Sequence, residues 1–115
     1  MRKLETGTTK HTEIYAHSTE GQSVALYTVV EHNKDATVLS EIYFQNGPIK
    51  ETGLHGIFIE DALVIAHDRL SVLNTGKFEC DYNDRALHHI EHALQALRER
   101  TNDRAARQVE GTNKE

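Results

Sequence analysis

Tryptophan is absent from this chain, and cysteine and proline each occur once among its 115 residues. The single cysteine, Cys80, excludes an intramolecular disulfide and fits a reducing cytoplasm. No apolar run approaches the roughly 18 residues that a membrane-spanning helix needs, and Met1–Glu5 lacks the apolar stretch of a signal peptide. We therefore expect a protein of the cytoplasm that has no membrane partner.

Basic residues are outnumbered: 13 lysines and arginines stand against 18 aspartates and glutamates, which gives a net charge of -5. Non-specific binding to DNA needs a net basic surface, so we expect no DNA partner. One small anionic ligand in a local basic pocket remains compatible with this charge. At this length, with 37% apolar residues, a monomer would have a thin core, so we also expect association into an oligomer.

Sequence motifs of catalysis are missing as well. The chain has no G-x-S-x-G, P-loop or G-x-G-x-x-G sequence, and no cysteine–histidine pair at a recognisable spacing. We interpret Cys80 as a small buried residue between two helices rather than as a nucleophile. We therefore predict no enzymatic activity, no catalytic residue and no cofactor.

The N-terminal part of the chain has the pattern of strands. Residues 1–10 are polar without a period, and we expect them to be flexible. In the region 11–47, three runs rich in β-branched and aromatic residues are separated by short polar turns; they cover residues 12–16, 24–30 and 37–44. Strands joined by such short loops pair antiparallel, so we predict a β-meander of about three strands.

From 48 to 109 the pattern becomes helical. Two apolar stripes of similar length have steps of three and four residues: Ile59, Leu63, Ala66, Leu70 and Leu73, then Leu87, Ile90, Leu94, Leu97 and Thr101. Asn74-Thr75-Gly76 ends the first helix, and Asp81 or Asn83 can cap the second. We predict an α+β fold in which the meander precedes a two-helix hairpin, with a polar tail at 110–115.

Histidines and arginines gather on the second predicted helix. His88 and His92 have the i, i+4 spacing of a helical metal pair, but zinc sites use three or four ligands, so we expect polar surface histidines and no metal. Arg100, Arg104 and Arg107 fall on one side of the helix end. A solvated face favoured by the helix dipole is one interpretation, and a phosphate pocket completed by another subunit is the other.

Six short segments occur in one order between Phe44 and Thr112. They are Phe44-Gln45-Asn46-Gly47-Pro48, Gly53-Leu54-His55-Gly56, Asp68-Arg69-Leu70, Phe78-Glu79-Cys80-Asp81-Tyr82-Asn83, Arg100-Thr101-Asn102-Asp103-Arg104 and Glu110-Gly111-Thr112. With these segments the chain resembles the phage-encoded Thoeris anti-defence proteins of the sponge type, whose helical hairpin is shared with a phage inhibitor of CBASS cyclic-nucleotide signalling. The resemblance covers about two thirds of the chain and is loose in the strands.

The resemblance implies a binding function without catalysis. Such proteins bind a nucleotide alarm signal of the host, a glycocyclic ADP-ribose isomer, and hold it intact in pockets between subunits, so that the immune effector never receives it. Some relatives also bind cyclic di- or trinucleotides at separate sites of a hexamer. For this chain the resemblance implies a small signalling nucleotide as partner, a dimer-based homo-oligomer up to a hexamer, and action in the cytoplasm of the host bacterium.

The expected ligand-binding residues combine the resemblance with the residue pattern; they are Phe78, Asn83, His88, His89, Arg100, Arg104 and Arg107. Phe78 could stack on a nucleobase and the arginines could pair with the pyrophosphate. The family usually has Asn at the position of His55, and its second helix commonly has Thr-Lys where this chain has His88-His89. Two rival functions remain: an oligomeric protein that inhibits a host defence protein directly, and a small hydrolase of the signal.

Overall fold

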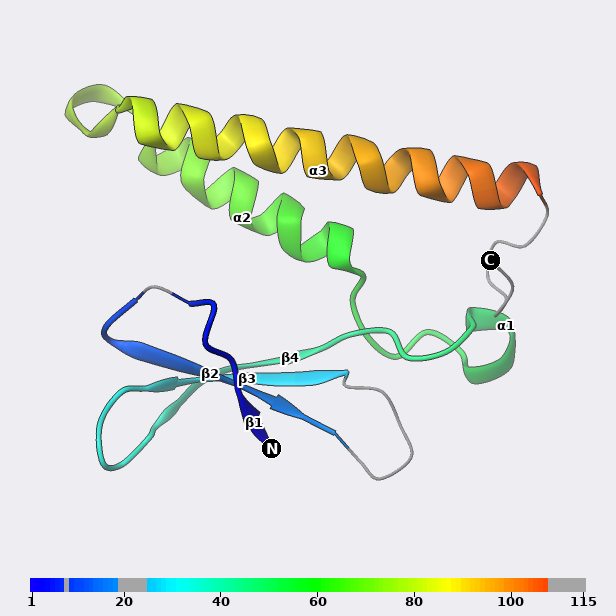
Figure 1. Ribbon diagram of the computed structural model, residues 1–115, viewed down its shortest axis with the longest axis horizontal. Coiled ribbons are helices and arrows are strands. Elements are labelled where there is room, and N and C mark those ends of the chain that lie inside the picture. The colour runs from blue at the N-terminus through cyan, green and yellow to red at the C-terminus, as the bar shows by residue number, and fades with distance from the viewer. Residues whose placement is uncertain (8, 19–24, 108–115) are drawn as a thin grey trace. The chain divides into compact units, whose positions relative to one another are not determined.

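A computed structural model describes residues 1–7, 9–18 and 25–107 (Figure 1). The chain divides into two compact units, a sheet unit and a hairpin unit. The sheet unit comprises Met1–Gly47 and Glu51–Ile57, and the hairpin unit comprises Pro48–Lys50 and the chain from Phe58 onward. A short helix, α1 (Ile49–Thr52), contributes to both. The α+β class is confirmed, and the tail expected at 110–115 lies outside the described residues.

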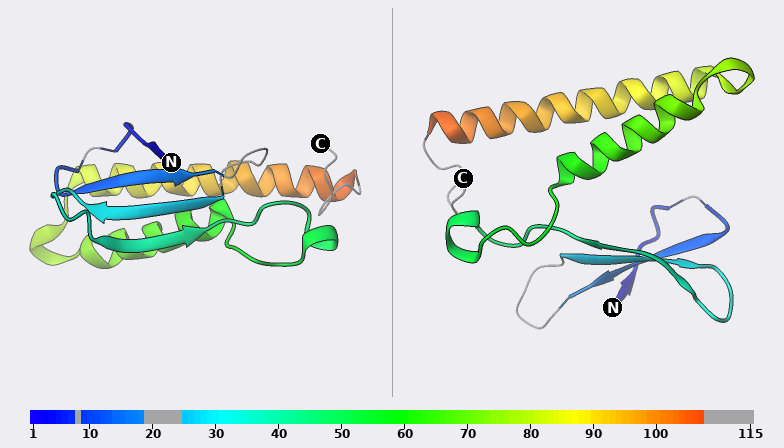
Figure 2. Two further views of the ribbon diagram at one scale, coloured as in Figure 1. Left: turned by 90° about the horizontal axis from the view of Figure 1, so that it is seen from below. Right: turned by 180° about the vertical axis from the view of Figure 1, so that it is seen from behind.

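The sheet has four antiparallel strands in the order β1-β2-β3-β4, where about three were expected. They are β1 (Arg2–Lys3), β2 (Thr12–His17), β3 (Leu26–Glu31) and β4 (Val38–Tyr43), and Figure 2 (left) shows the last three side by side. The additional strand is β1, which lies inside the segment 1–10 that was expected to be flexible. In this strand Arg2 pairs with Ala16 of β2. Two charged residues carry no alternating pattern, so nothing in the composition of β1 signals a strand.

The strand register gives the sheet two faces of mixed character. Residues opposite one another in an antiparallel pair lie on the same face of the sheet. One face carries the polar residues Glu13, Tyr15, His17, Thr28 and Glu41 together with the apolar Leu26 and Val30. The other face carries Ile14, Ala16, Tyr27, Val29 and Ile42 together with the polar Glu31 and Ser40. Ala16 and Thr28 are buried, on opposite faces, and Nε2 of His17 lies 2.9 Å from the Thr28 hydroxyl.

After β4 the chain forms a loop whose first and last residues pair with each other. Phe44 and Ile57 form a parallel bridge, and the Gln45 side chain accepts a hydrogen bond from the His55 N–H at 2.9 Å. Gly56 lies against the strand, because a Cβ atom there would be 2.4 Å from the carbonyl carbon of Phe44. No other residue fits this position without moving the backbone, so the loop depends on glycine.

The hairpin unit contains α2 (Ile59–Leu73), the short 3-10 helix η1 (Gly76–Phe78) and α3 (Asp81–Ala106), as the two stripes predict (Figure 1). The second stripe is half-buried as expected, at Leu87, Ile90, Leu94, Leu97 and Thr101. In the first stripe only Leu63 and Leu70 are half-buried, whereas Ile59, Ala66 and Leu73 are exposed in the single chain. The N-cap of α3 is Cys80, without a side-chain cap, so the expectation that Asp81 or Asn83 caps this helix was wrong.

Two polar contacts fix the register of α2 against α3. Nε2 of His67 lies 2.7 Å from Oε2 of Glu91, and Nδ2 of Asn74 donates to Oδ1 of Asp84 at 2.8 Å. From His67 to Asn74 the chain advances by as many residues as from Asp84 to Glu91, so the two antiparallel helices keep one register between the contacts. Continued to the start of α2, this register places Ile59 roughly opposite Glu99. With 26 residues against 15, α3 therefore projects about two turns beyond α2 (Figure 1).

Candidate functional site

The turn between α2 and α3 is organised by the side chain of Asn74. Its Oδ1 atom accepts hydrogen bonds from the backbone N–H of Cys80 at 3.1 Å and from Nδ2 of Asn83 at 3.4 Å. Gly76 has a φ of 57°, in the left-handed region that glycine adopts without strain, and this allows the chain to enter η1. Contacts from both helices thus hold the turn in one conformation.

Phe78 is presented to solvent by this turn. Its side chain is 66% exposed, while its backbone N–H donates to the Thr75 carbonyl at 3.1 Å and its carbonyl accepts from Nδ2 of Asn83 at 3.5 Å. The Nζ atom of Lys77 lies 5.3 Å from the ring centroid, within cation–π range. The structure therefore brings two expected site residues together: Asn83 fixes the backbone that carries the Phe78 ring.

Tyr82 and Arg85 lie beside these residues and were not among the expected site residues. Tyr82 is 75% exposed, and Cζ of Arg85 lies 5.1 Å from its ring centroid. The Arg85 guanidinium also forms an ion pair with Asp81 at 3.1 Å. A single exposed aromatic residue creates no period in a sequence, so only its place in the segment Phe78–Asn83 could have drawn attention to it. Cys80 is exposed, so the expectation that it is buried was wrong.

His88 and His89 lie exposed on α3. The ring centroid of His88 is 4.3 Å from that of His92 and 6.4 Å from that of His89. Among the described residues, no group of three or more His, Cys, Asp or Glu side chains is placed to hold a metal ion. His88 and His92 thus supply a pair of ligands at most, whereas zinc sites use three or four.

Glu91 connects this histidine-rich surface to α2. The hydrogen bond from His67 lowers the pKa of the Glu91 carboxyl below its ordinary value, and electrostatic attraction to His67, His88 and His92 acts in the same direction. The side chain of Glu91 is about half exposed, so solvent screens much of this interaction. The contact joins α3 to α2 within the hairpin.

The expected arginines lie at the opposite end of α3. Arg100 is exposed, Arg104 is half-buried, and Arg107 forms an ion pair with Asp103 at 3.0 Å. Between Asp81 and Arg104 the helix rises about 34 Å, at 1.5 Å per residue. A single hairpin therefore does not bring the arginine end to Phe78.

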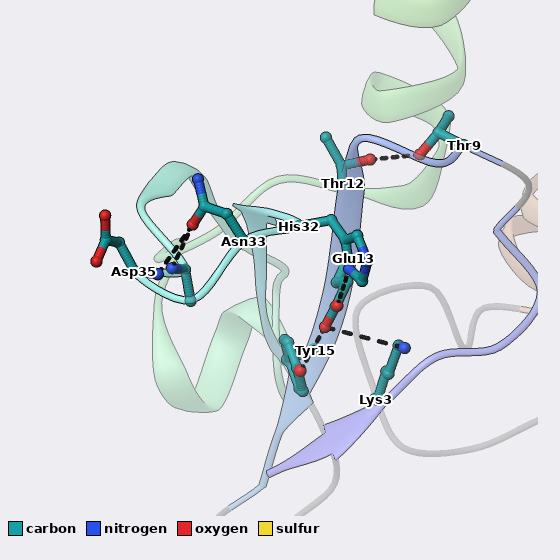
Figure 3. Close-up of polar contacts among 9 residues, drawn as sticks. Lys3, Thr9, Thr12, Glu13, Tyr15, His32, Asn33 and Asp35 are labelled. Carbon is teal, nitrogen blue, oxygen red and sulfur yellow. Dashed lines mark hydrogen bonds and ion pairs between the residues drawn. The ribbon is translucent and has the colours of Figure 1, made fainter.

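A second polar cluster surrounds Glu13 in the sheet unit (Figure 3). The Tyr15 hydroxyl donates to Oε2 of Glu13 at 2.6 Å, Nδ1 of His32 bonds Oε1, and Nζ of Lys3 lies 3.9 Å from Oε2. The hydrogen bonds from Tyr15 and then from His32 lower the pKa of the Glu13 carboxyl. The same carboxylate raises the pKa of the Tyr15 hydroxyl, because it stabilises the protonated form.

A cavity of about 330 Å³ opens beside Glu13. Its charged lining consists of two lysines and two glutamates, with His32 beside them: Lys3, Lys10, Glu5 and Glu13. Opposite charges in equal number select neither an anion nor a cation, so this cavity indicates no class of ligand. Its residues come from segment 1–10 and from strands whose pattern predicts only pairing, which is why sequence reasoning missed it.

Two of the short segments that carry the family resemblance follow β4, at residues 44–48 and 53–56, and they have a structural role. The backbone N–H of Asn46 donates to Nε2 of His55 at 3.0 Å, and Nε2 of Gln45 donates to the carbonyl of Gly53 at 2.7 Å. His55 therefore acts here as a hydrogen-bond acceptor that closes the loop.

No helix within the described residues combines the length and the apolar character that crossing a membrane requires. The helical hairpin, with its exposed aromatic turn and its distant arginine end, is thus the part of the chain that carries most of the expected site residues. A known family also matches a stretch of the chain that includes most of this hairpin.

The family described as "Acb2/Tad1, hairpin domain" matches residues 37–101, which include Phe78, Asn83, His88, His89 and Arg100. A protein of Bacillus phage SBSphiJ7 described as "Thoeris anti-defense 1" is 37% identical over 75 residues. That alignment covers 65% of this chain and 53% of the relative, so the chain spans about half the length of the curated relative it matches. The chain belongs to the Acb2/Tad1 hairpin domain family, which confirms the resemblance found in its short segments.

Proposed function

We propose that this protein is a phage anti-defence protein that binds a host immune signalling nucleotide of the glycocyclic ADP-ribose type and sequesters it without degrading it. Membership of the hairpin family and the name of the phage relative support an anti-defence role. The observation that carries the proposal is the exposed Phe78 ring on a turn held by Asn74 and Asn83. An exposed ring on a backbone held by hydrogen bonds is suited to stacking on a nucleobase.

The site is completed by a second copy of the chain. An antiparallel neighbour places the arginine end of its α3 beside the turn, where Arg100, Arg104 and Arg107 meet the pyrophosphate. The charges of the two ends are complementary: three carboxylates outnumber two cations in residues 77–85, and four arginines outnumber two carboxylates in residues 98–107. Apolar side chains exposed on α2 offer surface for such a contact; they are Val64, Ile65 and Val72.

The remaining residues have secondary roles in this proposal. Asn83 holds the backbone of Phe78 in place, as its hydrogen bond to the Phe78 carbonyl indicates. His88 and His89, exposed on the same helix, add donors toward phosphate oxygens when they are protonated. The set consists of an aromatic ring, hydrogen-bond donors and cations, which are the groups that bind a nucleobase and a pyrophosphate.

The decisive experiment measures whether the protein takes up the nucleotide and releases it unchanged. The protein is incubated with glycocyclic ADP-ribose, freed of unbound ligand by filtration and then denatured by heat, and the supernatant is analysed by chromatography with mass detection. Release of unchanged nucleotide in an amount comparable to the protein is expected, and Phe78→Ala serves as the weakened comparison. A chemically altered nucleotide would instead indicate a small hydrolase, and absence of uptake would favour an oligomeric protein that inhibits a host defence protein directly.

A further inference from the structure

Two aromatic rings, one in the inter-helix turn and one in the first turn of α3, share the same arrangement. Phe78 and Tyr82 are 66% and 75% exposed. Nζ of Lys77 lies 5.3 Å from the Phe78 ring centroid, and Cζ of Arg85 lies 5.1 Å from the Tyr82 ring centroid. A ring has two faces, and a cation over one face leaves the other accessible. Because both rings remain so exposed, each has an open face toward solvent.

The arrangement around Tyr82 is held by its own helix. Arg85 is paired with Asp81 one turn away at 3.1 Å, and this ion pair keeps the guanidinium close to the ring. A cation on one face withdraws electron density from the ring, which favours stacking of an electron-rich purine on the other face. In the described part of the chain the Tyr82 hydroxyl forms no hydrogen bond, so the fold does not depend on it.

We infer that Tyr82 is a second stacking residue of the ligand site, with the Asp81–Arg85 pair as the group that positions it. The inference rests on the proposed function and adds the Tyr82 ring to the Phe78 ring as a stacking group. The ligand class is a nucleotide whose purine base is accessible on its face. Lys77 and Arg85 contact the rings, so in this proposal the phosphates of the nucleotide are bound by the arginines at the end of α3 of a second copy.

The absence of tryptophan makes this inference directly measurable, because the four tyrosines dominate the protein's fluorescence. Stacking of a purine quenches the emission of the tyrosine beneath it. With glycocyclic ADP-ribose as the probe, we expect the tyrosine emission of the wild-type protein to fall on binding. Tyr82→Phe should keep its affinity within about twofold but lose most of that quenching, since phenylalanine still stacks. Tyr82→Leu should bind about tenfold more weakly.

Two controls separate stacking from a structural effect. Tyr43→Leu removes another exposed tyrosine, on β4, and should leave affinity unchanged. Arg85→Gln should weaken binding a few-fold, and Arg85→Lys, which retains a cation, should restore most of the loss. Unchanged binding by Tyr82→Leu, or full quenching in Tyr82→Phe, would overturn the inference while leaving the proposed function intact. Failure of the wild-type protein to bind the probe would overturn both.

Discussion

Oδ1 of Asn74 accepts a hydrogen bond from the backbone N–H of Cys80 at 3.1 Å, which joins the end of α2 to the start of α3. The same side chain contacts Asn83 and Asp84, so one residue fixes both ends of the turn that carries Phe78. Preorganisation of this kind lowers the entropy cost of binding. The stability of the turn and the affinity for a ligand should therefore depend on the same side chain.

Replacing Asn74 with alanine should consequently affect both properties. We expect Asn74→Ala to reduce the free energy of unfolding by about 1–2 kcal/mol, because it removes hydrogen bonds to two helices. Urea denaturation followed by circular dichroism measures this loss. Asn102→Ala, at an exposed position of α3, is the matched control and should cause little change. Equal stability of the two variants would show that the turn is held by other contacts.

A pH dependence follows from the contact between His67 and Glu91. The hydrogen bond lowers the pKa of Glu91 in the folded protein relative to the unfolded chain, so the carboxylate stabilises the fold above the unfolded pKa. This contribution is lost as the pH falls through the folded pKa. We expect Glu91→Gln to lower the melting temperature at pH 6 and to have a smaller effect below about pH 4.

The comparison for Glu91 is Glu99→Gln, which neutralises another exposed carboxylate of α3. Melting curves of both variants at several pH values, at low and high salt, provide the measurement. High salt should reduce the difference caused by Glu91→Gln, because both partners are partly exposed. A difference between wild type and Glu91→Gln that stays constant down to pH 3 would contradict the assignment of the lowered pKa.

The loop after β4 gives a prediction in the sheet unit. Nε2 of His55 accepts the Asn46 N–H at 3.0 Å and so helps to close the loop. We expect His55→Ala to lower the protection of the Asn46 amide against hydrogen exchange, because the acceptor is removed. In His55→Gln the side-chain oxygen can accept in place of Nε2, so most of the protection should return. Equal protection in His55→Ala and in the wild type would show that other contacts hold the loop.

The apolar stripes predicted both helices because packing of α2 on α3 imposes a period on residues such as Leu63 and Leu94. They did not predict how far α3 extends, since the second stripe ends at Thr101 whereas the helix continues to Ala106. Strand β1 was missed because its pairing is decided by the backbone of β2 and not by Arg2 or Lys3.

The candidate site was predictable in part. Phe78 and Asn83 belong to one short segment, so their proximity could be expected from the sequence, and the structure joins them. Tyr82 was missed because an exposed ring leaves no periodic pattern. The arginine end could be located on α3 but not assigned to the turn, because about 34 Å of helix separates Arg104 from Asp81. The sequence does not predict which chain supplies the arginine, because this depends on how the chains assemble.

The last prediction concerns this shared site. Charge-assisted contacts to phosphate contribute roughly 1.5–3 kcal/mol each, so Arg104→Ala should weaken nucleotide binding about ten- to a hundredfold. Phe78→Ala should cause a comparable loss through missing stacking, roughly 1–3 kcal/mol. Calorimetric titration with glycocyclic ADP-ribose measures both. Wild-type affinity in both single variants would mean that the pocket lies elsewhere in the protein.

Mixing the two variants tests whether the pocket belongs to two chains. In a two-fold dimer that contains one chain of each kind, one pocket combines an intact Phe78 with an intact Arg104, and the other pocket lacks both. After subunit exchange between equal amounts, about a quarter of all pockets should bind with wild-type affinity. The pure variants, carried through the same exchange procedure, are the controls and should show none. If both groups came from the same chain, the mixture would recover no tight pocket, and the antiparallel arrangement of hairpins would be wrong.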